Sequence, residues 1–370
     1  MTVTLTGTLL QRLEEKVLRM VQQMGDKSPH VARADGKYDD MATDWWTSGF
    51  WPGMLWIMYD MTGNEKFKEA AWGWDAKIEP WLTKTSLDLH HDVGFQFLAT
   101  AVIKHTLTGD ADGLRRGLQA ANFLAGRFNP AGNFIRAWNG DDNAGWAIID
   151  CMMNISLLFW ASEVTGDPRY RHIAVRHADT ALANFIREDG SVRHIVSFDP
   201  ETGGFIEAFG GQGFAPDSAW SRGNAWALHG FANVYRWTKD VKYLHAAKRV
   251  AHYFIAALPE DGVAHWDFRT GENNPPRDSS ASAIAASGLL EIADAVGEGE
   301  RGLYLKKAEH IVASLTENYG TWDDPSHEAI LTQGTGHLPA NSNINVSLIY
   351  GDYYYIEAVA KLNGWKHRIH

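Results

Sequence analysis

A helical unit recurs along this chain at uneven spacing, and it limits the possible folds more than any other feature. Each copy has an apolar helical segment, a short turn and an amphipathic segment. Gly favours the end of a helix, and Asp or Asn favours the start of the next one. A repeat of this kind predicts a series of helical hairpins. The turns are Thr62-Gly63-Asn64, Thr108-Gly109-Asp110, Thr165-Gly166-Asp167, Thr238-Lys239-Asp240 and Val296-Gly297-Glu298.

The helices before and after these turns differ in character. Those before the turns are apolar or rich in small residues, so we expect them to be covered on all sides. Those after the turns, such as 170–178 and 243–251, have one charged face and fit an outer layer. The inner helices are expected at 50–61, 93–107, 151–164, 224–237 and 280–296, with a sixth at 346–362.

The two ends of the chain complete the set. An amphipathic helix at 9–24 lacks an inner partner, and the helix at 346–362 lacks an outer one. Pairing them gives six hairpins in a closed ring, so the predicted fold class is all-α, an (α/α)6 barrel. Short β segments are expected in loops such as 191–198. No composition shift or long linker divides the chain, which predicts a single domain over residues 1–370.

Composition excludes several functions. The net charge is −11 without a basic cluster, which argues against nucleic-acid binding. No apolar run approaches the roughly 20 residues of a membrane span, and residues 1–24 do not resemble a signal peptide, so a cytoplasmic protein is predicted. The single cysteine, Cys151, excludes an internal disulfide and a Cys-based zinc site.

Polar, acidic and aromatic residues stand just before the inner helices. Since these helices run in the same direction, their N-termini share one face, and their partial positive charge favours an anionic ligand there. Any of the aspartates could instead be a helix cap, and Arg222 could pair with one of them. The acidic residues are Asp44, Asp92, Asp150 and Asp278, and the aromatic ones are Trp45, Trp46, Trp51, Trp138, Trp220 and Trp226.

Asp150 has the most unusual setting of these acids. It lies between Ile149 and a Cys-Met-Met run, where a charge is costly to bury unless the group is paired or protonated. A carboxyl that stays protonated near neutral pH can act as a general acid, and the alternative is a helix cap. The nearby His90-His91-Asp92 stretch matches no common metal-site spacing, so no metal is predicted. Cys151 is not expected to be a nucleophile, because apolar surroundings raise the pKa of a thiol.

Seven stretches, in order along the chain, resemble the unsaturated glucuronyl hydrolases of glycoside hydrolase family 88. They extend from about residue 40 to 360. The stretches are Thr43-Asp44-Trp45 with Gly49-Phe50-Trp51, His90-His91-Asp92-Val93-Gly94-Phe95, Ile149-Asp150-Cys151-Met152-Met153-Asn154, Trp220-Ser221-Arg222-Gly223-Asn224-Ala225-Trp226, Pro259-Glu260-Asp261-Gly262-Val263 with Trp266-Asp267-Phe268, Arg277-Asp278-Ser279-Ser280-Ala281-Ser282-Ala283, and Gly351-Asp352-Tyr353-Tyr354-Tyr355.

This resemblance implies a cytoplasmic hydrolase on an (α/α)6 barrel that needs no cofactor. Its substrates would be lyase-generated oligosaccharides, from glycosaminoglycans or similar polymers, that end in a 4,5-unsaturated uronic acid. The enzyme would release that sugar by hydrating the C4=C5 vinyl ether. The resemblance also implies that Asp150 is the general acid and base and that Asp92 is the second catalytic carboxylate. The implied substrate contacts are His91, His194, Gln212, Ser218, Arg222 and Trp226, with Trp46 and Trp138 stacking nearby.

Three alternatives stay open at this point. An unsaturated rhamnogalacturonyl hydrolase has the same barrel and chemistry, a sugar epimerase of the acylglucosamine type has a similar barrel, and a non-catalytic carbohydrate-binding barrel needs no reactive acid. The residues expected to contact a sulfated aglycone are His337, Lys366, His367 and Arg368.

Overall fold

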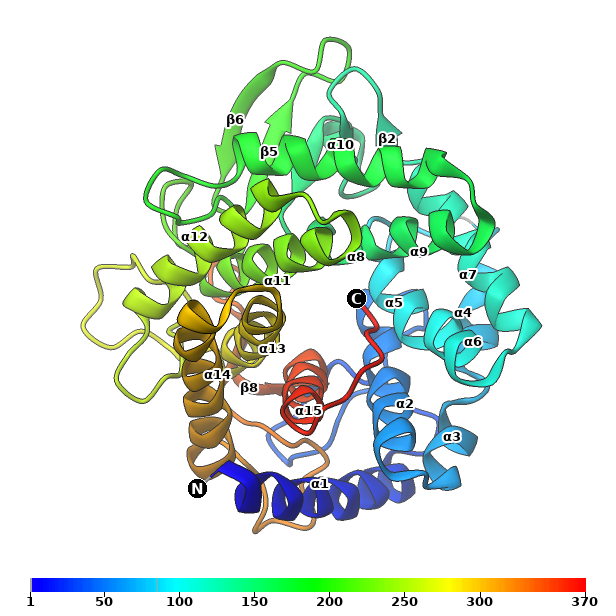
Figure 1. Cartoon of the computed structure of the whole chain (residues 1–370), viewed down its shortest axis with the longest axis vertical. Helices are drawn as coiled ribbons and strands as arrows, with labels where there is room; N and C mark the ends of the chain where they lie inside the picture. The colour runs from blue at the N-terminus through cyan, green and yellow to red at the C-terminus, as the bar shows by residue number, and fades with distance from the viewer. Residues whose placement is uncertain (1, 85) are drawn as a thin grey trace.

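Two concentric rings of helices dominate the computed structural model, which describes residues 2–84 and 86–370 (Figure 1). The inner ring consists of α2 (Phe50–Thr62), α5 (Val93–Phe97) with α6 (Ile103–Thr108), α8 (Cys151–Asn154) with α9 (Ser156–Thr165), α11 (Ser221–Thr238), α13 (Ser279–Ala295) and α15 (Ile349–Leu362). The outer ring consists of α1 (Thr2–Met24), α3 (Glu65–Ala71) with α4 (Trp74–Ile78), α7 (Ala111–Ala125), α10 (Pro168–Asn184), α12 (Val241–Ala257) and α14 (Glu298–Asn318). Helix α1 contacts α15, so the ends pair as expected and the predicted (α/α)6 barrel is confirmed.

The turns between inner and outer helices are capped largely as predicted. Gly63, Gly109 and Gly166 have φ values of 70°, 71° and 70°, in the left-handed region that glycine adopts readily. The side chains of the following residues accept hydrogen bonds from the next helix, namely those of Asn64, Asp110, Asp167 and Asp240. The fifth turn differs, because Val296 and Gly297 are both extended, so Gly297 does not end α13 in the expected way.

The inner helices are less regular than the sequence suggested. The second contains a π-helical turn, η3 (Leu98–Val102), and the third is interrupted at Ile155 between α8 and α9. The prediction that the sixth begins at residue 346 is wrong, because α15 begins at Ile349. Residues Ser342–Leu348 form strand β8, in which β-branched side chains and pairing with two neighbouring strands favour extended backbone.

Small antiparallel sheets lead into the starts of the inner helices. One sheet has the order β1 (Val31–Ala32), β8, β7 (Gly334–His337), and another has the order β4 (Trp146–Ile148), β5 (Ile195–Phe198), β6 (Phe205–Phe209). The predicted β segment at 191–198 is therefore partly confirmed. Leu348 pairs with Val31 directly before α15, and Ile148 pairs with Ile195 two residues before Asp150. The strands thus fix where the helix starts lie. A separate two-stranded sheet consists of β2 (Phe128–Asn129) and β3 (Phe134–Ile135).

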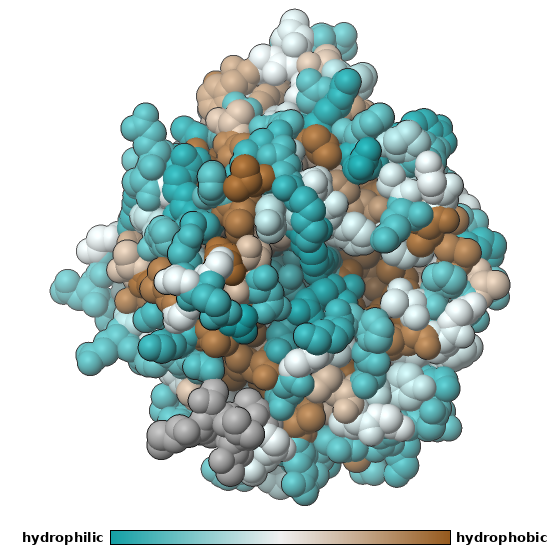
Figure 2. Space-filling model, in the orientation of Figure 1, coloured by the Kyte–Doolittle hydropathy of each residue, from teal (hydrophilic) through white to brown (hydrophobic). Residues whose placement is uncertain are grey.

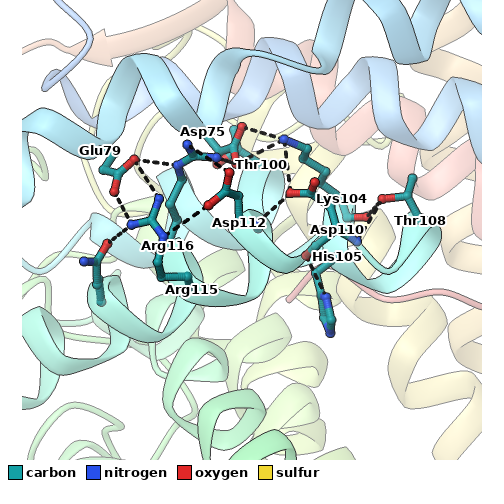
Figure 3. Close-up of polar contacts among 12 residues, drawn as sticks. Asp75, Glu79, Thr100, Lys104, His105, Thr108, Asp110, Asp112, Arg115 and Arg116 are labelled. Carbon is teal, nitrogen blue, oxygen red and sulfur yellow. Dashed lines mark hydrogen bonds and ion pairs between the residues drawn. The ribbon is translucent and has the colours of Figure 1, made fainter.

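A buried ion-pair network joins the far end of the second inner helix to the outer ring (Figure 3). The carboxylate of Asp75 on α4 lies 3.3 Å from Lys104 Nζ on α6 and 2.9 Å from Arg116 Nη1 on α7. Arg116 Nε also bonds Glu79 Oε2 at 2.6 Å. Two cations around Asp75 compensate the cost of burying its charge, so the network holds three helices together.

The surface seen in the orientation of Figure 1 is hydrophilic over the middle of the ring, where the C-terminal residues lie (Figure 2). Among the described residues, no helix combines the length and the apolar character that crossing a bilayer requires.

Candidate active site

A cavity of about 300 Å³ opens where the starts of several inner helices meet. It receives side chains from before α2, α5 and α8, from the first turns of α11 and α15, and from the β7–β8 hairpin. The predicted convergence of helix starts on one mouth is therefore confirmed for these segments. The lining residues are His30, Trp45, Trp46, His90, His91, Asp92, Trp138, Ile148, Asp150, Gln212, Arg222, Gly336, His337, Ala340, Ser342, Asn343 and Tyr350.

A larger cleft, of about 760 Å³, lies between α14 and the far ends of α13 and α15. It contains none of the site residues expected from the sequence. The smaller cavity is the candidate site because the convergent polar groups and the carboxyl with a displaced pKa are there.

Asp150 precedes α8 and does not cap it. Its backbone is already helical, with φ −58° and ψ −28°, and its side chain makes no capping hydrogen bond. Its Oδ1 atom is buried and has no hydrogen-bond partner in the described part of the chain. Burial raises the pKa of Asp150 to about 7, and the negative charge of Asp92 adds to the rise. The carboxyl can therefore hold a proton near neutral pH.

Asp92 has the opposite character, although it lines the same cavity. Its Oδ1 lies 3.1 Å from His91 Nε2 and accepts a hydrogen bond from Asn154 Nδ2 at 3.2 Å, and its Oδ2 lies 3.6 Å from His90 Nδ1. Burial alone would raise the pKa of Asp92, but His91, His90 and Asn154 together hold it below the usual value. Asp92 is therefore ionised while Asp150 holds a proton.

One ring nitrogen of His91 is engaged by a main-chain carbonyl. His91 Nδ1 lies 2.9 Å from the carbonyl oxygen of Ala137. A carbonyl can only accept, so Nδ1 carries a hydrogen. The other ring nitrogen, Nε2, faces the carboxylate of Asp92, with 3.1 Å between His91 Nε2 and Asp92 Oδ1.

Arg222 lies at the floor of the cavity and its donors are largely occupied. Its Nη1 atom pairs with Asp278 and donates to the carbonyl of Thr335 at 2.7 Å, and its Nη2 donates to Gln212 Oε1 at 2.5 Å. Asp278 also caps α13 by accepting from Ser280 N, so of the four aspartates considered as caps this one has that role. The alternative of a structural pairing for Arg222 is confirmed.

The structure brings most of the predicted site residues together. Gln212, Trp46, Trp138 and His91 line the cavity with Asp92, Asp150 and Arg222. His194 lies just behind them: its Nδ1 lies 2.9 Å from Gln212 N and 3.1 Å from the carbonyl oxygen of Gly210, and its buried Nε2 has no partner among the described residues. Burial lowers the pKa of His194 to about 3, so it is neutral.

Other predicted residues lie outside the cavity lining. Ser218 donates its hydroxyl to Asp267 Oδ2 at 2.6 Å, and Trp226 is buried against Phe95.

The expectation that the C-terminal basic residues contact a sulfated aglycone is wrong. His367 Nδ1 lies 2.6 Å from Asp60 near the end of α2, and Arg368 pairs with Glu291 towards the end of α13. Both acids are on the opposite end of the inner ring, because the cavity is at the helix starts.

Sequence reasoning missed His30 and Tyr350, whereas His337, expected at an aglycone, does line the cavity from β7. His30 packs against Trp45 and Trp46, with ring centroids 5.5 Å and 6.2 Å apart, but no motif surrounds it in the sequence. Tyr350 directly precedes one of the motif stretches and could have been found there. Asn341, Asn343 and Asn345 have φ values of 51–56°, a region that asparagine adopts more often than most residues. Asparagine at every second position was therefore the sequence signal for an irregular strand.

His90, His91 and Asp92 are the group in the described chain that could hold a metal ion. Their candidate ligand atoms lie within 4.8 Å of one another. Ligand atoms around tetrahedral zinc, with bonds of about 2 Å, are only about 3.4 Å apart. The two rings are stacked and His91 Nδ1 is occupied by Ala137, so these residues are not preorganised for a metal.

The sequence profile of Glycosyl Hydrolase Family 88 matches residues 16–367. The chain belongs to this family. It is 39% identical over 93% of its length to the unsaturated glucuronyl hydrolase of Bacillus sp. strain GL1, of which it covers 93%. It is 34% identical over 90% of its length to the unsaturated chondroitin disaccharide hydrolase of Streptococcus pyogenes, of which it covers 85%.

Solved structures of family 88 enzymes agree with this. The Bacillus sp. GL1 enzyme, responsible for the degradation of glycosaminoglycan, has a TM-score of 0.91 at 38% identity, with 94% of each chain covered. A variant of the Streptococcus agalactiae enzyme complexed with dGlcA-GalNAc6S has a TM-score of 0.81 at 30% identity, with 96% of this chain and 91% of that chain covered. The predicted unsaturated glucuronyl hydrolase activity is confirmed, and these relatives favour it over the rhamnogalacturonyl and epimerase alternatives.

Proposed function

We propose that Asp150 starts the reaction of this family 88 hydrolase by protonating C4 of a terminal 4,5-unsaturated uronic acid. The C4=C5 bond is conjugated with the ring oxygen, so protonation at C4 leaves an oxocarbenium-like centre at C5. A single observation supports this role best. A carboxyl with a pKa of about 7 and an unpartnered oxygen stands in a cavity beside an ionised Asp92.

The remaining steps return the proton and release the aglycone. Water attacks C5, and Asp150, now a carboxylate, accepts its proton. The resulting hemiketal opens to a keto acid, and the sugar at C1 expels the aglycone as an alcohol. No nucleophile attacks the anomeric carbon, so the usual separation between two carboxylates does not determine the outcome. The charge of Asp92 stabilises the positive centre and keeps Asp150 protonated before each cycle.

Substrate recognition follows from the donors that the protein leaves free. Arg222 holds Gln212 by its Oε1, so the Gln212 amide nitrogen is available to an acceptor on the sugar. The Nε2 atom of His194 is buried without a partner in the described chain, so it can meet a polar atom of the sugar. Together with the helix N-termini, these groups suit the substrate carboxylate. Trp46 and Trp138 provide flat apolar surfaces for sugar rings.

A panel of lyase-generated disaccharides tests the proposed substrate. Unsaturated disaccharides from chondroitin, hyaluronan, heparin, gellan and rhamnogalacturonan are incubated with the enzyme, and the loss of C4=C5 ultraviolet absorbance is followed. We expect turnover of glucuronyl-type substrates and little turnover of the rhamnogalacturonan product. Binding without loss of absorbance across the panel would instead favour a carbohydrate-binding barrel. The cytoplasmic location stays a prediction.

Sulfated aglycones are expected to react more slowly than plain ones. In the described lining of the cavity Arg222 is the sole Lys or Arg, and Asp278 already neutralises it. Burial lowers the pKa of His337, so this residue is neutral at pH 7 and offers no positive charge. We expect one sulfate to lower kcat/KM roughly tenfold, which corresponds to about 1.4 kcal/mol. Matched sulfated and unsulfated chondroitin disaccharides measure this ratio, and faster turnover of the sulfated one would contradict it.

A further inference from the structure

Asn154 ends α8 and is fully buried between the two proposed catalytic aspartates. Its Oδ1 accepts a hydrogen bond from Phe95 N at 2.7 Å. Its Nδ2 donates to Asp92 Oδ1 and to the main-chain carbonyl of Asp150, each at 3.2 Å. One side chain therefore contacts the segments that hold both aspartates.

The orientation of the Asn154 amide is fixed by these partners. A backbone N–H can only donate, so the atom facing Phe95 N is the carbonyl oxygen. The amide nitrogen must then face Asp92 and Asp150, and both of its hydrogens have acceptors. If the amide were flipped, these three hydrogen bonds could not all form. The Asn154 amide nitrogen on α8 therefore stays directed at Asp92 as a donor.

The backbones of α5 and α8 also meet at this point. A Cβ atom added at Gly94 would lie 2.6 Å from Asn154 Cα and 2.7 Å from Asn154 Oδ1. Such distances are far below van der Waals contact, so only glycine fits beside Asn154. Gly94 thus lets the helix that begins after Asp92 approach the helix that begins after Asp150 closely enough for one amide to reach both.

We infer that Asn154 is a positioning residue of the reaction: through its amide it holds the carboxylate of Asp92 at a fixed place beside Asp150. This inference rests on the proposed roles of the two aspartates. Asn154 itself does not contact the cavity, and it acts only through Asp92 and the Asp150 main chain. Its donor favours the ionised form of Asp92, which the mechanism needs at the moment Asp150 gives up its proton.

Replacing Asn154 leaves the charges around Asp92 in place. The charged or titratable groups near Asp92 are His90, His91, Arg127, Asp150, Cys151 and Tyr354. None of them is altered in Asn154→Ala, so a change in the pH dependence of this variant reports the lost hydrogen bond.

For Asn154→Ala we expect kcat to fall 10- to 100-fold, KM to change less than threefold, and the acidic limb of kcat/KM to move up by about one pH unit.

A second variant and a control complete the experiment. Asn154→Ser retains a small donor, and we expect it to recover part of the activity and part of the limb shift. Asn233→Ala removes another buried amide that packs on α8, where its Nδ2 lies 3.9 Å from Met153 Sδ without touching either aspartate. This control should keep the wild-type kcat and pH profile.

The outcomes separate this inference from the proposed mechanism. Folded Asn154→Ala and Asn154→Ser enzymes with wild-type kcat and an unmoved acidic limb would overturn the inference while leaving the mechanism intact. A similar loss in Asn233→Ala, without any limb shift in the Asn154 variants, would also overturn it, because burial alone would explain the loss. If an Asp150→Asn enzyme assayed in parallel were fully active, the proposed mechanism itself would fail.

Discussion

Asp150→Asn should lose about 10²- to 10⁴-fold in kcat/KM on an unsaturated disaccharide while folding normally, the range that general acid catalysis typically contributes. Asparagine has the shape of a protonated carboxyl but cannot transfer its proton to C4. In the wild-type enzyme, kcat/KM should fall as the pH rises above about 7, because the free enzyme then loses the proton of Asp150. Substrate affinity should change little, since the side chain is uncharged in both proteins.

The same substitution should stabilise the fold at neutral and alkaline pH. The pKa of Asp150 is raised from 3.8 to about 7 in the folded chain, so the native state binds its proton more tightly than the unfolded state. The free energy of unfolding therefore decreases between pH 4 and pH 7 and is then constant with respect to this group. Asparagine avoids that loss, so the stability gain should grow over this interval to at most about 4 kcal/mol.

Asp352→Asn is the matched control for Asp150→Asn. Burial raises the pKa of Asp352 to about 6, but three donors satisfy its carboxylate: Tyr38 Oη, Ile330 N and Leu331 N, each at 2.8 Å. In Asp352→Asn an amide nitrogen would face an N–H or O–H group, and two donors cannot bond each other. This variant should therefore be less stable than wild type. The folded enzyme should keep the wild-type kcat. Thermal unfolding and initial rates from pH 4 to pH 9 measure both effects. A fully active Asp150→Asn enzyme would remove Asp150 from the mechanism.

Local signals explain why much of the barrel could be predicted from the sequence. A Gly followed by Asp or Asn ends one helix and starts the next by short-range hydrogen bonds, as at Gly109 and Asp110. Apolar and small-residue segments then indicate which helices are enclosed. The start of α15 was missed because extended backbone at Ser342–Leu348 depends on pairing with β1 and β7, and β1 is distant in the sequence.

The candidate site shows the same division between local and long-range information. Asp150 and Asp278 both precede an inner helix, so the sequence could not tell a cap from an acid. Asp278 caps α13 and meets Arg222, whereas the Oδ1 of Asp150 meets no donor. Contacts with segments far along the chain make this difference. His30 could not be predicted either, because its place in the cavity depends on packing against Trp45 and Trp46.

Asp92→Asn should also cost the enzyme most of its activity, but its effect on stability at pH 7 should be opposite to that of Asp150→Asn. Without the negative charge of Asp92, the pKa of Asp150 should fall, so the alkaline limb of kcat/KM should move to lower pH. The positive centre at C5 would lose its nearby counter-charge as well. We expect kcat to fall roughly 10²- to 10³-fold, about 2.7 to 4 kcal/mol, as when one electrostatic stabiliser is removed from an active site.

Stability separates the two aspartates most clearly. His91 and its neighbours depress the pKa of Asp92 below its usual value, so this group stabilises the fold above its unfolded pKa, and that stabilisation is lost as the pH falls through the folded pKa. Asp92→Asn should thus be less stable than wild type at pH 7, with the difference shrinking towards pH 3, whereas Asp150→Asn should be more stable at pH 7. Denaturant unfolding of both variants at the two pH values measures the signs. If both variants shifted stability in the same direction at pH 7, the two carboxyls would not hold opposite protonation states, because an ionised Asp92 and a protonated Asp150 require opposite shifts.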